Sequence, residues 1–439
     1  MGSHRSPADA VRPAGDEPSH RADARRILVM RGLRSLAYGL LSVVLAIALT
    51  NAGVSPVAIG ILITVSLVGD MVGTYVIGIA ADAWGRRRML ALLALLMAGT
   101  GVIFGLTTSY PLLLVAAFFG TLGISASETA PFLPIDQAMI AQVTIPAKRT
   151  TLFARYNLVA AFSVAVGALG AGLPDALVHL GLPLASGIRL LFGMYAALAL
   201  LVAGLSLRLS PQVEAPRHSA RREQSLRQRL VPPLGRSRGI VWRLMGLFSV
   251  DALAGGLVVQ SLMVLFFHLR FGVSLTALST LFFGANLLSA LSFLAAVPLA
   301  RRIGLLNTMV FTHLPSNVLL VLVAFAPTFP VAAAILLLRQ LLSQMDVPTR
   351  QAYTMALVTP EERTAAASVT SLARSVGSAT SPVLSGLLLQ GSLLVFGLPF
   401  ILAGILKAAY DSSLWLLFRH VHLQEEERGG SKSAKTPPT

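Results

Sequence analysis

The chain has 439 residues, of which 55% are hydrophobic and 12% are charged, and its mean hydropathy is +0.74. Since an ordinary soluble domain carries about 25% charged residues, this composition excludes a soluble globular protein and indicates a membrane protein. The net charge of +16 does not call for a nucleic acid partner, because basic loops of a membrane protein account for it. Cysteine is absent, which excludes disulfides, thiolate metal sites and cysteine nucleophiles.

Twelve apolar stretches are long enough to cross a bilayer, since a hydrocarbon core of about 30 Å needs about 20 apolar residues in a helix. The expected spans are 31–51, 57–80, 88–107, 111–143, 149–173, 188–208, 243–266, 274–299, 307–326, 331–357, 364–389 and 398–418. The sequence therefore predicts an all-α polytopic membrane protein.

The arginine-rich stretch 209–238 divides these spans into two sets of six. We expect an N-terminal six-helix bundle at 29–208, a cytoplasmic linker at 209–238 and a C-terminal six-helix bundle at 239–418. Residues 1–28 are polar and lack an apolar run, so we expect a disordered cytoplasmic N-terminal tail there. Residues 419–439 should form a cytoplasmic C-terminal tail.

Lys and Arg residues gather in alternate loops, which predicts the orientation of the chain. The loops at 51–56, 107–111, 326–330 and 390–397 contain none. The basic set comprises the N-terminal tail, Arg86 to Arg88, Lys148, Arg149, the central linker, Arg301, Arg302, Arg363 and the C-terminal tail. Both termini should therefore lie in the cytoplasm.

One segment of the first half recurs in the second half, 214 positions later: PIDQAMIAQVTIPAKRT at 134–150 matches PTRQAYTMALVTPEERT at 348–364. Gln137 falls on Gln351, and Asp136 falls on Arg350. A second match relates Gly53-Val54-Ser55 to Gly272-Val273-Ser274, so the halves form a parallel repeat. The match could be a remnant of duplication without a present role, but we interpret the exchange of Asp136 for Arg350 as functional.

The loop after the second span reads Gly78-Ile-Ala-Ala-Asp82-Ala-Trp-Gly85-Arg86-Arg87-Arg88. It resembles the signature loop of the major facilitator superfamily (MFS), G-x-x-x-D-x-x-G-R-R/K, which lies at the same place. The resemblance implies two six-helix halves that rock around a site near the bilayer midplane. Gly85 would allow a tight turn, and Asp82 with the arginines would pair with each other or with a helix end. Alternatively, the arginines serve only to set the topology.

Two motifs of proton-driven drug exporters in this superfamily are missing: span four has no arginine, and the glycines of span five lack the usual proline. The stretches ETAPFLPIDQA in span four and KAAYD in span twelve resemble uncharacterised, drug-efflux-like bacterial members. This resemblance implies a multi-pass protein of the bacterial plasma (inner) membrane and no particular substrate.

Ionisable residues inside the predicted spans would each cost about 2.5–3.5 kcal/mol if they faced lipid at a helix centre, so they must face each other or a hydrated cavity. In span four, Glu128 and Asp136 are eight residues apart around Pro131 and Pro134, so both can flank one cavity. We interpret Asp136 or Glu128 as the proton-coupling carboxylate. Alternatively, Asp136 pairs with an arginine such as Arg350.

Span ten holds Arg339, Asp346 and Arg350 on one face, with Pro348 inviting a kink. These residues, with Gln137 and Gln351, are candidates for substrate contacts or for a buried ion pair that only locks helices together. In span twelve, Lys407 and Asp411 are four residues apart, and we expect an intramembrane pair of structural value.

Four further charges fall in spans: Asp70, Asp251, Arg34 and Arg374. The two arginines could be partners of the carboxylates or could reach to the surface. We expect Asp251 to lie near the cytoplasmic interface, where a charged side chain costs little free energy.

The sequence favours a secondary transporter that works by alternating access, with proton-coupled export of a small, amphipathic molecule. The alternatives are proton-coupled uptake or exchange of a small organic anion and, from another class, a non-transporting membrane sensor or assembly partner. No His, Cys or metal-binding pattern supports an enzyme, a cofactor or a bound metal, and no Gly-Lys-Ser/Thr loop supports ATP as the energy source. We expect the partners to be the lipid bilayer, a small-molecule substrate and protons, with no nucleic acid and with the chain as a monomer.

Overall fold

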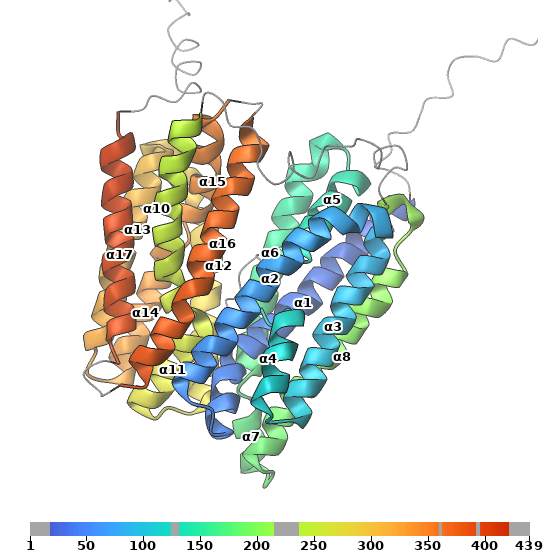
Figure 1. Ribbon diagram of the computed structural model, residues 1–439, viewed down its shortest axis with the longest axis vertical. Helices are drawn as coiled ribbons and strands as arrows, with labels where there is room; N and C mark the ends of the chain where they lie inside the picture. The colour runs from blue at the N-terminus through green and yellow to red at the C-terminus, as the bar shows by residue number, and fades with distance from the viewer. Residues whose placement is uncertain (1–17, 124–130, 215–236, 360–361, 392–395, 421–439) are drawn as a thin grey trace, which may run out of the picture.

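The computed structural model describes residues 18–123, 131–214, 237–359, 362–391 and 396–420, and the regular secondary structure in these ranges is helical throughout (Figure 1). The first half contains α1 (Pro18–Asn51), α2 (Pro56–Trp84), α3 (Arg86–Leu106), α4 (Tyr110–Phe119), α5 (Leu133–Val143), α6 (Pro146–Gly170), α7 (Leu173–His179) and α8 (Leu184–Leu207). A short 3₁₀ turn, η1 (Pro211–Val213), follows. The second half contains α10 (Arg238–Leu257), α11 (Gln260–Phe271), α12 (Leu275–Ile303), α13 (Leu305–Phe325), α14 (Phe329–Ser343), α15 (Asp346–Leu357), α16 (Arg363–Leu389) and α17 (Leu398–Phe418).

Ten helical stretches in the described ranges are long and apolar enough to cross a membrane. The two remaining predicted spans are also helical. One is divided into α4 and α5, with residues 124–130 outside the described part, and the other is α16, which spans Arg363–Leu389. The polytopic helical fold expected from the sequence is therefore confirmed.

The repeated Gly-Val-Ser motif has a local structural role in both halves. Gly53 and Gly272 have φ angles of +80° and +62°, which favour glycine because a side chain is strained there. The serine two positions later accepts a hydrogen bond from the third backbone N–H beyond it, Ser55 from Ala58 and Ser274 from Ala277. The motif thus ends one helix and caps the next in each half.

Three predicted spans are divided within the membrane. The fourth breaks between α4 and α5, the seventh at Val258–Val259 and the tenth at Gln344–Met345. The last break agrees with the kink predicted from Pro348, which has no N–H to donate to the carbonyl of Gln344. That carbonyl accepts the N–H of Val347 at 3.4 Å. The N–H of Gln344 is donated to the hydroxyl of Ser292 on α12 at 3.2 Å. The break in the seventh span was not expected.

α1 begins at Pro18, so residues 18–28 are helical and the predicted tail boundary at residue 28 is wrong. The helix extends because Asp23, which is fully buried, accepts hydrogen bonds from the backbone N–H and hydroxyl of Ser210 and from Arg26. The beginning of α1 is thereby attached to the segment that follows α8.

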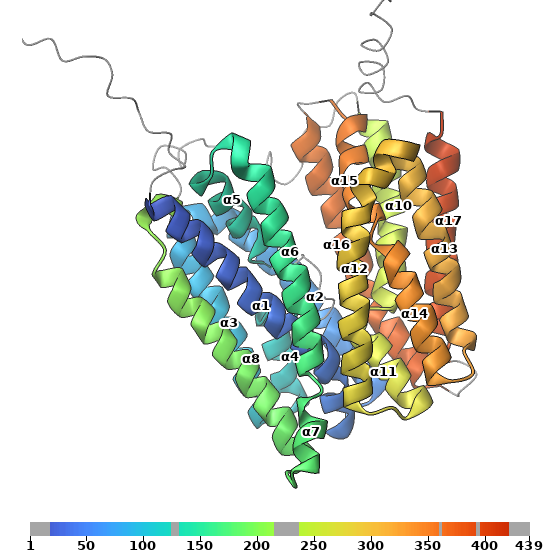
Figure 2. The ribbon, with the colours of Figure 1, turned by 180° about the vertical axis from the view of Figure 1, so that it is seen from behind.

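The two halves contact each other at one side of the bundle and diverge toward the other (Figures 1 and 2). We call the side where α1 begins and α17 ends the terminal side, and the other the opposite side. Near the opposite side, α2 and α16 cross so closely that a Cβ on Gly60 would lie 2.5 Å from the carbonyl oxygen of Pro382. The carboxylate of Asp175 on α7 accepts the N–H of Thr276 on α12 at 2.7 Å.

Candidate functional site

The first half encloses an ion pair between α1 and α5. A terminal nitrogen of Arg34 donates to Oδ2 of Asp136, and both side chains are fully buried. The hydroxyl of Tyr156 on α6 donates to the same oxygen at 2.6 Å. Three helices are therefore joined at one carboxylate.

Aromatic rings surround the two cations of this group. The guanidinium carbon of Arg34 lies 4.3 Å from the ring centroid of Phe132, and that of Arg31 lies 4.7 Å from the ring of Tyr156. Cation–π contacts of this kind stabilise a desolvated guanidinium. Nε and Nη1 of Arg34 and Oδ1 of Asp136 have no hydrogen-bond partner among the described residues. Oδ1 of Asp136 can therefore still accept a proton, and the two nitrogens of Arg34 can still donate hydrogen bonds to water.

The second half is organised around Asp251 on α10, which contacts three cations from three other helices. Its carboxylate lies 2.5 Å from Nζ of Lys407 on α17, 3.0 Å from Arg374 on α16 and 3.3 Å from Arg350 on α15. Arg350 also binds Asp346, one helical turn before it, at 2.6 Å. Asp251 is buried, so the expectation that it lies near an interface is wrong. It bridges helices at the centre of the half.

Lys407 and Asp411 do not form the expected pair, because each reaches a different helix. The ammonium of Lys407 binds Asp251, while the carboxylate of Asp411 lies 2.9 Å from Nδ1 of His313 on α13. The side-chain amide of Asn317 donates to Asp411 at 2.8 Å. The sequence did not predict the roles of His313 and Asn317. His313 could have been found, because it is an ionisable residue inside predicted span nine.

Arg339 differs from the other cations of the second half because no carboxylate among the described residues lies within salt-bridge distance of it. Its Nη1 donates to the amide oxygen of Gln340 at 2.9 Å, and its buried Nε has no hydrogen-bond partner in the described structure. The hydroxyl of Ser343 donates to the same amide oxygen. Arg339 is therefore a buried cation that forms no ion pair within the described part of the protein.

The exchange of Asp136 for Arg350 in the repeat is accompanied by a second exchange, so that both members of the ion pair have opposite charges in the two halves. Asp136 binds Arg34 on the first helix of its half, whereas Arg350 binds Asp251 on the first helix of the other half. Asp251 follows Arg34 by 217 positions, close to the offset of the repeated segments. Both halves thus hold an ion pair at equivalent places, with opposite polarity. The alternative pairing of Asp136 with Arg350 is wrong.

The signature loop forms the junction between α2 and α3, and Gly85 turns there with φ +102°. Arg86 contacts both α5 and the segment after α8: it donates to the side-chain oxygen of Gln142 at 2.7 Å and to the carbonyl of Val213 at 3.1 Å. The carboxylate of Glu214 accepts the N–H of Arg86 at 2.6 Å, at the N-terminus of α3. This anion suits the positive end of the helix dipole. Glu214 was not found from the sequence.

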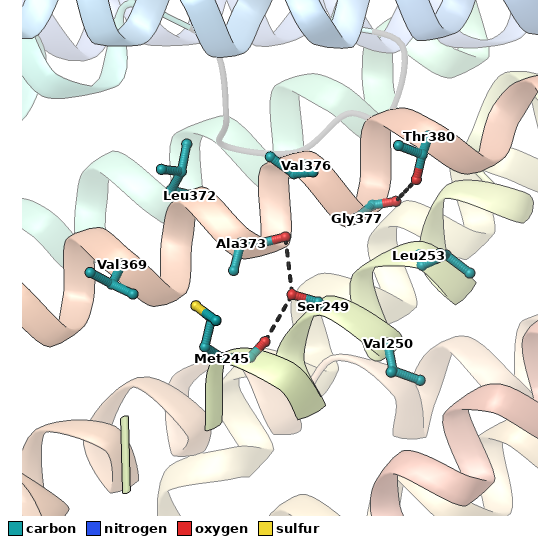
Figure 3. Close-up of a pocket in the computed structure, with 10 residues that line it drawn as sticks. All are labelled: Met245, Ser249, Val250, Leu253, Val369, Leu372, Ala373, Val376, Gly377 and Thr380. Atoms are coloured by element: carbon teal, nitrogen blue, oxygen red, sulfur yellow. Dashed lines mark hydrogen bonds between the residues drawn. The ribbon is translucent and has the colours of Figure 1, made fainter. Parts of the chain in front are cut away.

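A pocket of about 520 Å³ lies between α10 and α16 (Figure 3). The lining side chains are mainly apolar: Met245, Ser249, Val250, Leu253, Val369, Leu372, Ala373, Val376, Gly377 and Thr380. The hydroxyl of Ser249 is donated to the backbone carbonyls of Met245 and Ala373. The pocket can therefore accommodate an apolar group beside the Asp251 cluster, which uses the same two helices.

The other predicted site residues are not gathered with these groups. Gln137 and Gln351 are exposed, and Gly78 is exposed near the end of α2. Glu128 lies outside the described residues, as does the side chain of Asp82. Tyr156 completes the first ion pair but gave no signal in the sequence.

Comparisons with known proteins agree with this architecture. The family model of the Major Facilitator Superfamily matches residues 27–345 and 263–438. The chain is 28% identical over 412 residues to an uncharacterized membrane protein of Saccharomyces cerevisiae, covering 88% of this chain and 92% of the yeast protein. The solved nucleoside transporter NupG aligns with a TM-score of 0.68 at 13% identity, over 90% of this chain and 99% of that one. A D-xylose-proton symporter gives 0.69 at 15% identity, over 90% and 97%.

Proposed function

Because the chain belongs to the major facilitator superfamily, we propose that it is a proton-coupled secondary transporter that exports a small amphipathic molecule by alternating access. The observation that carries the proposal is the buried group of Arg34, Asp136 and Tyr156. Asp136 is held by one cation and one hydroxyl, so a single proton can neutralise it and release Arg34. Burying an ion pair of this kind in a membrane bundle costs free energy, and ionisable residues inside spans commonly mark ion or substrate pathways.

Alternating access requires two halves that separate at one side while they meet at the other. The crossing of α2 and α16 and the hydrogen bond from Thr276 to Asp175 support closure at the opposite side. The halves diverge toward the terminal side (Figure 2). By the distribution of Lys and Arg we propose that this side faces the cytoplasm of a bacterial cell. The conformation would then be open inward.

An amphipathic substrate suits the second half. The apolar pocket between α10 and α16 can bury hydrocarbon, at about 25 cal/mol per Å² removed from water. The polar groups of Arg350, Asp251 and Arg374 lie on the adjoining helices. The substrate would thus contact the second half while the proton acts on the first.

One observation favours a second candidate function, the uptake or exchange of a small organic anion. Arg339 is buried and has no anionic partner among the described residues. A substrate carboxylate would supply the missing charge. In this case Arg339→Gln should abolish anion flux, whereas a substitution of the exposed Arg155 to Gln should leave it unchanged.

The test is proton movement in everted membrane vesicles that contain the protein, followed with a pH-sensitive dye while amphipathic and anionic solutes are added. Proton efflux on addition of a solute, lost in Asp136→Asn, is the expected result. Asp411→Asn makes the same chemical change on α17, at the edge of the bundle farthest from the first half (Figure 1), and should retain efflux. Solute flux without proton movement in either direction would contradict the proposal.

A further inference from the structure

Asp70 lies in the middle of α2 and is 8% exposed. Its carboxylate forms no ion pair and no side-chain hydrogen bond with any residue that the structure describes. Among the residues that the structure describes, the other acids deep in the spans are held by a cation or by an imidazole: Asp136, Asp251, Asp346 and Asp411. Asp70 differs from them because no described cation or imidazole lies within salt-bridge distance of it.

Two tyrosines near Asp70 cannot compensate for that charge. Tyr38 on α1 and Tyr195 on α8 are close enough to interact with it electrostatically. The hydroxyl of Tyr38 donates to the hydroxyl of Thr121 at 3.0 Å, and that of Tyr195 donates to the backbone carbonyl of the same residue. Both phenol protons are thus committed to Thr121 rather than to Asp70.

The buried and half-buried cations that the structure describes on the helices packed against α2 have other partners as well. Arg31 of α1 lies over the ring of Tyr156. Arg34 of α1 binds Asp136 of α5, and Arg374 of α16 binds Asp251. Arg86, at the start of α3, binds Gln142 and the carbonyl of Val213. α4 contains no cationic residue. An ionised Asp70 would be a buried and unpaired charge, which proteins avoid by protonating the group.

The backbone around Asp70 places it beside the division of the fourth span. Gly69 packs against α4 so tightly that a Cβ there would lie 2.0 Å from the carbonyl oxygen of Phe118. A Cβ on Gly73 would lie 3.1 Å from the side chain of Pro131, just before α5. These glycines hold Asp70 next to the point where the helix is interrupted, as is typical of ion sites in transporters with divided helices.

We propose that Asp70 is a proton-binding site, occupied in this conformation while Asp136 remains ionised and bound to Arg34. The proposal rests on the proposed function and adds a residue to it. In this conformation the proton of the first half is bound at Asp70, and Asp136 stays ionised against Arg34 until a proton neutralises it later in the cycle. A proton is the ligand that fits, because one carboxylate with two committed hydroxyls offers too few oxygen ligands for a metal ion.

The test is infrared spectroscopy of the purified full-length protein at neutral pH, with the C=O stretch of a protonated carboxylic acid as the signal. This signal requires no substrate. We expect the band in the wild type, its loss in Asp70→Asn, and its retention in Asp136→Asn. The thermal unfolding midpoint of Asp70→Asn should stay close to that of the wild type, because one neutral side chain replaces another of the same shape.

A band that persists in Asp70→Asn would overturn the proposal. So would a band that disappears when sodium replaces potassium in the buffer, since the site would then bind sodium. A stable Asp70→Asn protein that lacks the band confirms the site whether or not vesicles show proton efflux. Absence of efflux from a wild type with the Asp70 band would contradict the proposed function alone, so the two failures are distinguishable.

Discussion

The two halves of this transporter hold an ion pair at equivalent places of the repeat, and they differ in polarity and in the number of partners. In the first half Asp136 meets one arginine, Arg34, and one hydroxyl. In the second half Asp251 meets Lys407, Arg374 and Arg350. Neutralising Asp136 would leave one buried cation without an anion, whereas neutralising Asp251 would leave three in contact with a neutral group.

This difference assigns distinct tasks to the halves. A carboxylate shared by three cations is hard to protonate, because each cation favours its ionised form. The second half should therefore keep its charges through the transport cycle and remain rigid around Asp251. If transport is proton-coupled as proposed, the first half is the half that would respond to protons, because it holds a single ion pair and Asp70 has no ion-pair partner among the described residues. The reversed polarity would then be a functional asymmetry between duplicated halves.

The largest effect should follow from Asp251→Asn, which removes the anion shared by three cations. Breaking a buried pair by removing one partner costs about 3–5 kcal/mol, and we expect a loss in stability at the upper end of that range. Thermal unfolding in detergent measures it. The matched control is Asp175→Asn, whose amide oxygen can still accept the hydrogen bonds that Thr276 donates; only the negative charge of the acceptor is lost, which should cost about 1 kcal/mol. Equal stability of both variants would show that the Asp251 cluster does not hold the second half together.

A decisive effect on function is expected from exchanging the charges of the first half. Arg34→Asp and Asp136→Arg should each cost about 3–5 kcal/mol, and the combined variant should recover about 0.5–3 kcal/mol as coupling energy. Its polarity would then match the second half.

The exchanged variant should fold and yet lose proton-coupled flux, because Tyr156 would face a cation in place of the carboxylate to which it donates. Vesicle assays and unfolding midpoints of the two single variants and the combined one check this. Flux at the wild-type level in the combined variant would mean that the reversed polarity is a remnant of duplication.

The sequence predicted the fold well because the length of the apolar stretches, the charge of the loops and the parallel repeat can be read directly from it. It also predicted that buried charges face each other or a hydrated cavity, and it left open whether Arg34 and Arg374 bind carboxylates or reach the surface. It did not predict which partners meet. Asp136 binds Arg34 because α1 packs against α5, and Lys407 turns away from Asp411 because α10 presents Asp251 to it. These choices depend on how helices pack.

Residues of common types gave no sign in the sequence of their part in the site. Tyr156 is one of seven tyrosines and becomes special only because α6 places its hydroxyl 2.6 Å from Asp136. Glu214 belonged to a predicted linker, and its role at the N-terminus of α3 depends on a chain reversal after α8. Spacing in the sequence cannot reveal contacts of this kind, because they join segments far apart in the chain.

The smallest effect, and the sharpest test of the first half, is expected from Tyr156→Phe. Loss of a hydrogen bond to a charged group costs about 1.5–3 kcal/mol, and we expect the lower value because Arg34 still binds Asp136. Without the hydroxyl the ionised carboxylate is less favoured, so proton-coupled flux should reach its half-maximal rate at a higher pH than in the wild type. Tyr38→Phe, which loses a bond to the neutral Thr121, should cost about 1 kcal/mol and leave the pH profile in place. A profile that shifts equally in both variants would mean that Asp136 is not the group whose charge the transport cycle changes.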